Sequence, residues 1–224
     1  MKDLKAKNYM NKKYNVILFD MDGTLADTDP LIVEAFLRLY RKYGHGKVRP
    51  KEEIYYFSGP PVGKTLKEEF PDYDTSLLLK EFHEISNSLY KTHIFSFSYC
   101  KETILDLIKE GFKLGVVTNK SHDLTLYALE CVGLDNLFDV IIGVDDVDIG
   151  KPNPEGIFKA LNELNENNLD KVLYVGDNKS DYDTAKNAGV HIALVKWGPR
   201  SIPGDIKPDF YFSSYKHLKE HLYE

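Results

Sequence analysis

The sequence predicts an α/β fold with a parallel sheet and a helical segment inserted after the first strand. Three observations lead to this prediction. Short apolar runs alternate with stretches of helical periodicity, which is the order of βαβ units. The stretch from residue 29 to 94 contains helical patterns but no run typical of a buried strand. Hydrophobic residues make up 42% of the 224 residues, which is enough for a substantial core.

The first apolar run, Val16 to Phe19, has the β-branched and aromatic character of a buried parallel strand. It leads directly into Asp20-Met21-Asp22-Gly23. Two carboxylates are thus presented at a strand end, where an open α/β sheet keeps its ligands. Like charges this close repel, and a cation would relieve the repulsion. Taken alone, the motif is equally compatible with an acidic loop that caps the next helix.

The segment after this loop reads as a helical insert. Apolar residues recur at helical intervals from Asp29 to Tyr43 and again from Ser76 to His93. The proline- and glycine-rich stretch 47–63 reads as a loop with at most a short element. Two connections, near residues 26–29 and 95–99, would join the insert to the sheet. Such an insert can close over the double-aspartate loop and exclude water.

The rest of the chain alternates helices and strands. Gly111 and Gly189 stop two of the helices, and Asn153-Pro154 marks the start of another. The predicted helices span 101–110, 121–131, 153–164, 181–188 and 215–222, and the predicted strands span 114–117, 140–142, 172–175, 192–195 and, at an edge, 209–212.

Polar residues suited to phosphate follow each later strand. Thr118-Asn119 comes just before a helix start, where a hydroxyl and backbone N–H groups can bind an anion. Lys151 stands between Gly150 and Pro152, ahead of another helix. Asp177 and Asp181, four apart on a strand-to-helix turn, suit a hard divalent cation. Each motif alone is ordinary turn or capping chemistry. With the double-aspartate loop there are four such motifs on successive strand ends, and together they indicate a phosphate and metal site.

The order Asp20-x-Asp22-Gly23-Thr24-Leu25, then Thr118-Asn119, Lys151-Pro152 and Gly176-Asp177-x-x-x-Asp181 resembles the haloacid dehalogenase superfamily of phosphohydrolases. The resemblance spans residues 16–195. It implies a Rossmann-like core domain, residues 1–28 and 95–224, with an inserted α-helical cap domain of the C1 type, residues 29–94. It also implies Mg²⁺ as the cofactor and an aspartyl-phosphate mechanism.

The resemblance further assigns roles. Asp20 is expected to be the nucleophile, and Asp22 the acid that protonates the leaving oxygen and then activates water. Thr118 and Lys151 hold the transferring phosphoryl group. The expected metal ligands are Asp20, Asp22 through its backbone carbonyl, and Asp177, with Asp181 in support. The expected substrate-binding residues are Gly23, Asn119, Gly59 and Lys64.

These residues favour a phosphatase within the superfamily. The family's ion-pumping ATPases have threonine where this chain has Asp22, and its dehalogenases need no metal, whereas Asp177 and Asp181 are present here. We therefore expect hydrolysis of a small phosphorylated metabolite, a phosphoglycolate-like phosphomonoester. An inorganic pyrophosphatase, a 5′-nucleotidase and a β-phosphoglucomutase-type phosphomutase remain open. Outside the class, the alternative is a non-catalytic module that binds a phosphorylated ligand.

The stretch from Ser58 to Thr65 nearly matches a nucleotide-binding P-loop that follows the apolar run 54–57. Pro60 and Pro61 remove backbone donors that would cradle phosphates, which argues against that interpretation. The stretch is similar to the cap loop of phosphoglycolate phosphatases and of a related bacterial pyrophosphatase. Gly59 to Lys64 are therefore expected to face the substrate.

Composition limits the partners. The formal net charge of −6, without a dense basic run, argues against nucleic acid. No apolar run is long enough for a membrane span or a signal-peptide core. Cys100 and Cys131 are the only cysteines, so no disulfide framework is expected. We expect a cytoplasmic protein, a monomer or a homodimer, whose partner is a small phosphorylated metabolite.

Overall fold

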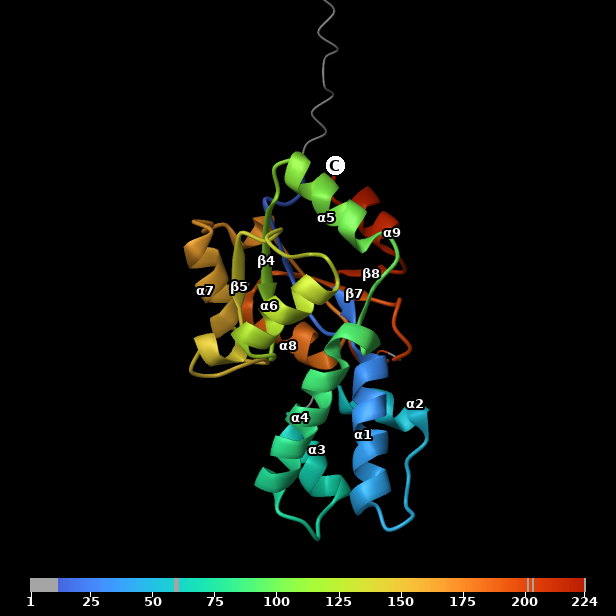
Figure 1. The fold of residues 1–224 in the computed structure, drawn as a ribbon. Coiled ribbons are helices and arrows are strands. Elements are labelled where there is room, and N and C mark those ends of the chain that lie inside the picture. The colour runs from blue at the N-terminus through green and yellow to red at the C-terminus, as the bar shows by residue number, and fades with distance from the viewer. Residues whose placement is uncertain (1–11, 59–60, 201, 203, 224) are drawn as a thin grey trace, which may run out of the picture.

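A six-stranded parallel sheet with helices on both faces forms the larger part of the molecule (Figure 1). The computed structural model describes residues 12–58, 61–200, 202 and 204–223. The strand order is β5-β4-β1-β6-β7-β8, and every neighbouring pair is parallel. The strands are β1 Val16–Phe19, β4 Lys113–Val117, β5 Val140–Ile142, β6 Val172–Gly176, β7 His191–Val195 and β8 Phe210–Phe212. The predicted α/β fold with a Rossmann-like parallel sheet is confirmed.

The helices follow the predicted alternation. They are α1 Asp29–Tyr43, α2 Lys51–Ile54, α3 Val62–Glu69, α4 Thr75–His93, α5 Cys100–Lys109, α6 His122–Cys131, α7 Glu155–Glu163, α8 Lys179–Ala188 and α9 Tyr215–Glu220. α7 begins slightly later than predicted, and the Asn153 side chain accepts a hydrogen bond from the backbone N–H of Glu155 there. None of the helices in the described ranges is long and apolar enough to cross a membrane.

Alternation along β1 divides the core into two layers. Ile17 and Phe19 belong to a hydrophobic cluster that includes buried residues of α5, α6 and α9. Val16 and Leu18 belong to a second cluster, with buried residues of α7 and α8. Because side chains of a strand point to opposite faces in turn, an uninterrupted apolar run is what a strand covered on both faces requires. β1 is therefore held firmly at the centre of the sheet.

Residues 29–94, which we call the helical segment, contain α1 to α4. Figure 1 shows these helices gathered at one end of the molecule, away from α5 and α9. α1 and α4 pack together, with the rings of Phe36 and Phe82 centred 5.5 Å apart. The two connections form a short antiparallel ribbon, in which β2 (Ala26–Asp27) pairs with β3 (Phe95–Ser96). The division into core and cap domains stays a prediction.

The stretch predicted as a loop holds more structure than expected. The apolar run that would precede a P-loop continues α2 as a 3₁₀ turn at Tyr55–Phe57, so no strand is found there. α3 begins directly after Pro61, whose fixed φ suits a helix start. Thr65 and Leu66 are its buried residues. The sequence pattern missed this helix because two prolines and Gly63 resemble a loop.

Candidate active site

The residues predicted to carry the chemistry meet at one edge of the sheet. Asp20 follows β1, Thr118 follows β4, and Asp177 follows β6. These three strands are adjacent and parallel, so their carboxyl ends lie side by side. Lys151 reaches the same edge from the connection between β5 and α7.

Lys151 is the central cation of this site. Its Nζ lies 2.6 Å from Asp20 Oδ1 and 2.6 Å from Asp181 Oδ1, and the Tyr174 hydroxyl is 3.2 Å away. The Lys151 side chain is only 6% exposed. Burial alone would lower the pKa of this ammonium, but the carboxylates of Asp181 and Asp20 raise it well above its ordinary value. Lys151 is therefore held as a permanent positive charge beside Asp20.

Asp181 is fully occupied by protein donors. Its Oδ2 accepts hydrogen bonds from the backbone N–H groups of Asp177 and Asn178, at 3.0 and 3.1 Å. Its Oδ1 accepts from Lys151 and from the Tyr174 hydroxyl, the latter at 3.2 Å. A side chain at Gly176 would run into Asp181, so only glycine allows this approach. Asp181 thus braces the loop after β6.

Three buried carboxylates form a group that fits a divalent cation. Oxygen atoms of Asp20, Asp177 and Asp181 all lie within 4.8 Å of one another. Burial, followed by the charge of Asp181, raises the pKa of Asp20 to about 6. Burial also raises the pKa of Asp177 to about 8, although the Arg200 guanidinium opposes the shift. Crowded, desolvated carboxylates of this kind suit Mg²⁺, which prefers oxygen ligands. Asp20 is the most available of the three, because the described residues engage only its Oδ1. Both oxygens of Asp177 and of Asp181 already have protein partners.

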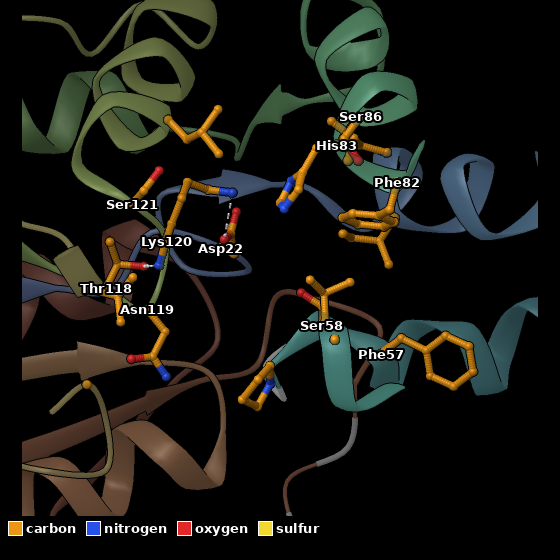
Figure 2. Close-up of a pocket in the computed structure, with 18 of the residues that line it drawn as sticks. Asp22, Phe57, Ser58, Phe82, His83, Ser86, Thr118, Asn119, Lys120 and Ser121 are labelled. Carbon is orange, nitrogen blue, oxygen red and sulfur yellow. Dashed lines mark hydrogen bonds and ion pairs between the residues drawn. The ribbon is translucent and has the colours of Figure 1, made fainter. Parts of the chain in front are cut away.

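Asp22 lies outside this carboxylate group and pairs with a different lysine. Its Oδ2 is 3.0 Å from Lys120 Nζ, as Figure 2 shows, while its buried Oδ1 has no partner among the described residues. The Tyr90 hydroxyl, from α4, is 3.1 Å from Lys120 Nζ. Gly23 follows with φ +83°, and a side chain there would collide with Arg200 and Asp177. The turn therefore requires glycine, and it separates the environments of Asp20 and Asp22.

The side chains of Thr118 and Asn119 make hydrogen bonds to different parts of the site. Thr118 is buried, and its Oγ1 accepts a hydrogen bond from the backbone N–H of Lys120 at 3.2 Å. The Asn119 amide is bonded on both sides to the backbone of Lys151, as donor at 3.1 Å and as acceptor at 2.8 Å. Asn119 lines the cavity, but its hydrogen bonds hold the Lys151 loop in place.

A cavity of about 600 Å³ lies between the strand ends and the helical segment, and Figure 2 shows part of its lining. Asp20, Asp22, Thr118, Asn119 and Lys151 all line it.

The two substrate contacts predicted for the stretch from Gly59 to Lys64 have different outcomes. Gly59 lies outside the described residues. Lys64 does not line the cavity, and its side chain is 70% exposed, 3.9 Å from Glu68. The buried residues of α3 are Thr65 and Leu66, and the adjacent Lys64 is left facing solvent. The structure therefore does not bring Lys64 to the site, although Gly63 beside it does line the cavity.

Arg200 is a site residue that sequence reasoning missed. Its guanidinium, 7% exposed, lies 2.7 Å from Asp177 Oδ2 and 3.5 Å from Asp29 Oδ1. It also donates a hydrogen bond to the backbone carbonyl of Ser58 at 3.3 Å. Arg200 therefore links Asp177, one of the three buried carboxylates, to the helical segment. No local pattern marks it, because its partners come from distant parts of the chain. Lys120 was also missed, although its position directly after Thr118-Asn119 is a usable signal.

Known proteins resemble this chain both in sequence and in fold. The family profile described as haloacid dehalogenase-like hydrolase matches residues 17–195. The chain is 36% identical to the pyrophosphatase PpaX of Halalkalibacterium halodurans, over 83% of this chain and 85% of that protein. It is 34% identical to PpaX of Listeria monocytogenes, over 90% and 93%. A crystal structure of a predicted phosphoglycolate phosphatase from Haemophilus somnus superposes with a TM-score of 0.83 and 19% identity, over 94% of this chain and 98% of that one, and shows the same fold.

Proposed function

The chain belongs to the haloacid dehalogenase-like hydrolase family, and from this we propose a Mg²⁺-dependent phosphatase that works through an aspartyl-phosphate intermediate. The observation that carries the proposal is the pairing of buried Asp20 with buried Lys151 at 2.6 Å. A carboxylate and a phosphoryl group are both anionic, so attack requires positive charge already in place. The lysine supplies part of that charge without any rearrangement.

The two aspartates divide the reaction. In the first step an Asp20 oxygen attacks phosphorus, and the bond from phosphorus to the leaving oxygen breaks as Asp22 donates a proton to that oxygen. In the second step Asp22 takes a proton from water, the water oxygen attacks phosphorus, and Asp20 and phosphate are released. The contacts of Asp22 support this role, because Lys120 fixes Oδ2 and leaves Oδ1 without a partner among the described residues.

The remaining residues orient and neutralise the phosphoryl group. Lys151 and Thr118 would contact its oxygens, and Asn119 would keep Lys151 in position. Asp20, the backbone carbonyl of Asp22 and Asp177 would hold Mg²⁺, with Asp181 in support. When bound, the ion offsets the negative charge of the carboxylates and of the phosphoryl group.

We assign residues 29–94 to a cap domain over a core formed by residues 1–28 and 95–224. The support is that Ser58, Phe82 and His83 of the helical segment line the same cavity as Asp20 and Asp22. Figure 2 shows these three residues together with Asp22. A segment in this position limits the access of water and selects the leaving group.

The preferred substrate class is a small phosphomonoester. Inorganic pyrophosphate is the second candidate, because the relatives at 34–36% identity are named pyrophosphatases. A phosphomutase would use the same core residues and would return the phosphoryl group to a second hydroxyl instead of water.

The test is an assay with p-nitrophenyl phosphate in Mg²⁺, repeated in EDTA, and followed by a panel ranked by kcat/KM. The panel contains phosphoglycolate, pyrophosphate, sugar phosphates and nucleoside monophosphates. We expect phosphate release that stops in EDTA and returns with added Mg²⁺. Isomerisation of a sugar phosphate without phosphate release would indicate the mutase. No turnover of any compound, or turnover indifferent to EDTA, would overturn the proposal.

A further inference from the structure

The cavity has two chemically different walls. The strand-end wall, formed by the lining residues outside the helical segment, carries its three lysine and arginine residues, Lys120, Lys151 and Arg200. The helical wall, formed by the lining residues of 29–94, carries no lysine or arginine among the described residues. Its surface is mainly apolar, with Leu31, Ile32, Phe36, Phe57, Leu79 and Phe82 as the large members.

The three cations are all already neutralised by carboxylates. Lys120 pairs with Asp22, Lys151 pairs with two aspartates, and Arg200 lies between Asp177 and Asp29. A leaving group with its own negative charge would therefore find no lysine or arginine without a carboxylate among the described lining residues. On the helical wall it would meet mainly apolar side chains, with the His83 imidazole and the uncharged groups of Ser58, Ser86, Asn87 and Tyr90 as the polar exceptions. Burial of an unpaired charge in such surroundings is strongly unfavourable. The helical wall thus selects against a charged leaving group.

One buried polar group of the helical wall lacks a partner. Ser86, on α4, is 5% exposed, and its hydroxyl makes no hydrogen bond to any described residue. It lines the cavity close to Phe82 and His83, as Figure 2 shows. Buried hydroxyls are normally hydrogen-bonded, so an orphan that lines a cavity points to a ligand group opposite it.

We infer that the substrate is the phosphate ester of an uncharged, largely apolar alcohol that carries one hydrogen-bonding group for Ser86. This inference rests on the proposed function for the phosphate end, which lies at the strand ends. The alcohol packs against the helical wall. A volume of about 600 Å³ is in the range of sites for organic ligands and exceeds what pyrophosphate or phosphoglycolate would fill.

The test uses n-alkyl phosphates from ethyl to hexyl, whose leaving alcohols have nearly the same acidity, so the chemical step stays constant. We expect kcat/KM to rise about threefold to fourfold for each methylene, the factor that ~0.8 kcal/mol per buried CH₂ corresponds to. The charged counterpart of hexyl phosphate, 5-carboxypentyl phosphate, should react at least about tenfold less efficiently. A flat series, or equal rates for these two compounds, would overturn the inference.

Two variants locate the effect on α4. Leu79→Asn should reduce the gain per methylene, whereas Leu77→Asn, on the same helix but 52% exposed and outside the cavity, should leave the series unchanged. Ser86→Ala should lower the preference for 6-hydroxyhexyl over hexyl phosphate by about twofold to tenfold. If Leu77→Asn and Leu79→Asn changed the series equally, the helical wall would not be the binding surface.

Calorimetry with non-hydrolysable n-alkylphosphonates separates this inference from the proposed function. Affinity that rises with chain length in a protein without phosphatase activity would overturn the proposed function alone. Active enzyme with equal affinities for ethyl- and hexylphosphonate would overturn the inference alone.

Discussion

The two walls of the cavity are built in opposite ways. On the strand-end wall, polar side chains are fixed by several contacts each, as for Lys151, which has two carboxylates and a tyrosine hydroxyl around its ammonium. On the helical wall, apolar side chains dominate, and the Ser86 hydroxyl has no hydrogen-bond partner among the described residues. The difference supports the proposal that fixed charges recognise the transferred phosphoryl group, while shape and burial recognise the leaving group. Substitutions on the strand-end wall should therefore reduce activity far more than substitutions at exposed positions near the helical wall.

The largest effect is expected for Asp20→Asn, which removes the proposed nucleophile. Turnover should fall by at least about 10⁴-fold, the scale seen when a covalent catalyst loses its nucleophile. The melting temperature should not fall, because an amide relieves the repulsion among the buried carboxylates. Asp183→Asn, on α8 and paired with Lys179, is the matched control. Near-wild-type kcat in Asp20→Asn would contradict the assignment.

The second-largest loss of activity is expected for Lys151→Ala. The substitution removes the charge at 2.6 Å from both Asp20 and Asp181, so kcat should fall about 10²- to 10³-fold, as for loss of a preorganised contact to a developing charge. Steady-state kinetics on the best substrate measure the loss. Lys159→Ala, a half-buried lysine of α7 that pairs with Asp146 and does not line the cavity, should change kcat little. A decrease of less than threefold in Lys151→Ala would mean that the lysine serves only the structure.

The buried carboxylates also predict how stability depends on pH. Burial is the chief reason that the pKa of Asp20 rises from 3.8 to about 6 and that of Asp177 from 3.8 to about 8. Between about pH 4 and 8 the folded protein therefore binds protons that the unfolded chain does not. Their contribution to the free energy of unfolding therefore falls as pH rises through this window. Mg²⁺ competes with these protons for the same oxygens.

Thermal unfolding with Mg²⁺ and with EDTA checks this expectation. The increase in Tm caused by Mg²⁺ should be several degrees larger at pH 8 than at pH 5, since ~1 kcal/mol shifts Tm by about 2–4 °C in a chain of this size. The difference between the two conditions cancels other titrating groups. Equal increases at both pH values would show that the ion does not bind at these carboxylates.

The smallest effect is expected for Lys64→Ala. Its exposed side chain does not line the cavity, so kcat/KM should change less than about twofold for any substrate. The same measurement on Lys67→Ala, another exposed lysine of α3, provides the comparison. A loss above tenfold specific to Lys64→Ala would restore the sequence-based expectation that this lysine contacts the substrate.

The sequence predicts the strand-end wall well because its information is local. Asp20, Thr118 and Asp177 each follow an apolar run directly, and parallel pairing of those runs is enough to bring them together. The helical wall depends on how α1 and α4 pack, which periodicity does not specify. Lys64 shows why the helical wall is harder to predict, because the direction of its side chain is set by helix α3, which the sequence pattern did not predict. Arg200 illustrates another limit, because its partners Asp29 and Asp177 are distant in sequence.

The short ribbon of β2 and β3 limits the entropic cost of changing the length or packing of the residues between the two strands. Because Asp27 pairs with Phe95, the two ends of the helical segment lie at neighbouring points, as they would in a tight hairpin. The closure entropy of a loop grows only slowly with its length, so the intervening residues can lengthen, shorten or repack at small cost. The strand ends that hold Asp20 and Thr118 would keep their positions. The residues of the helical wall can thus vary while the strand-end wall stays unchanged.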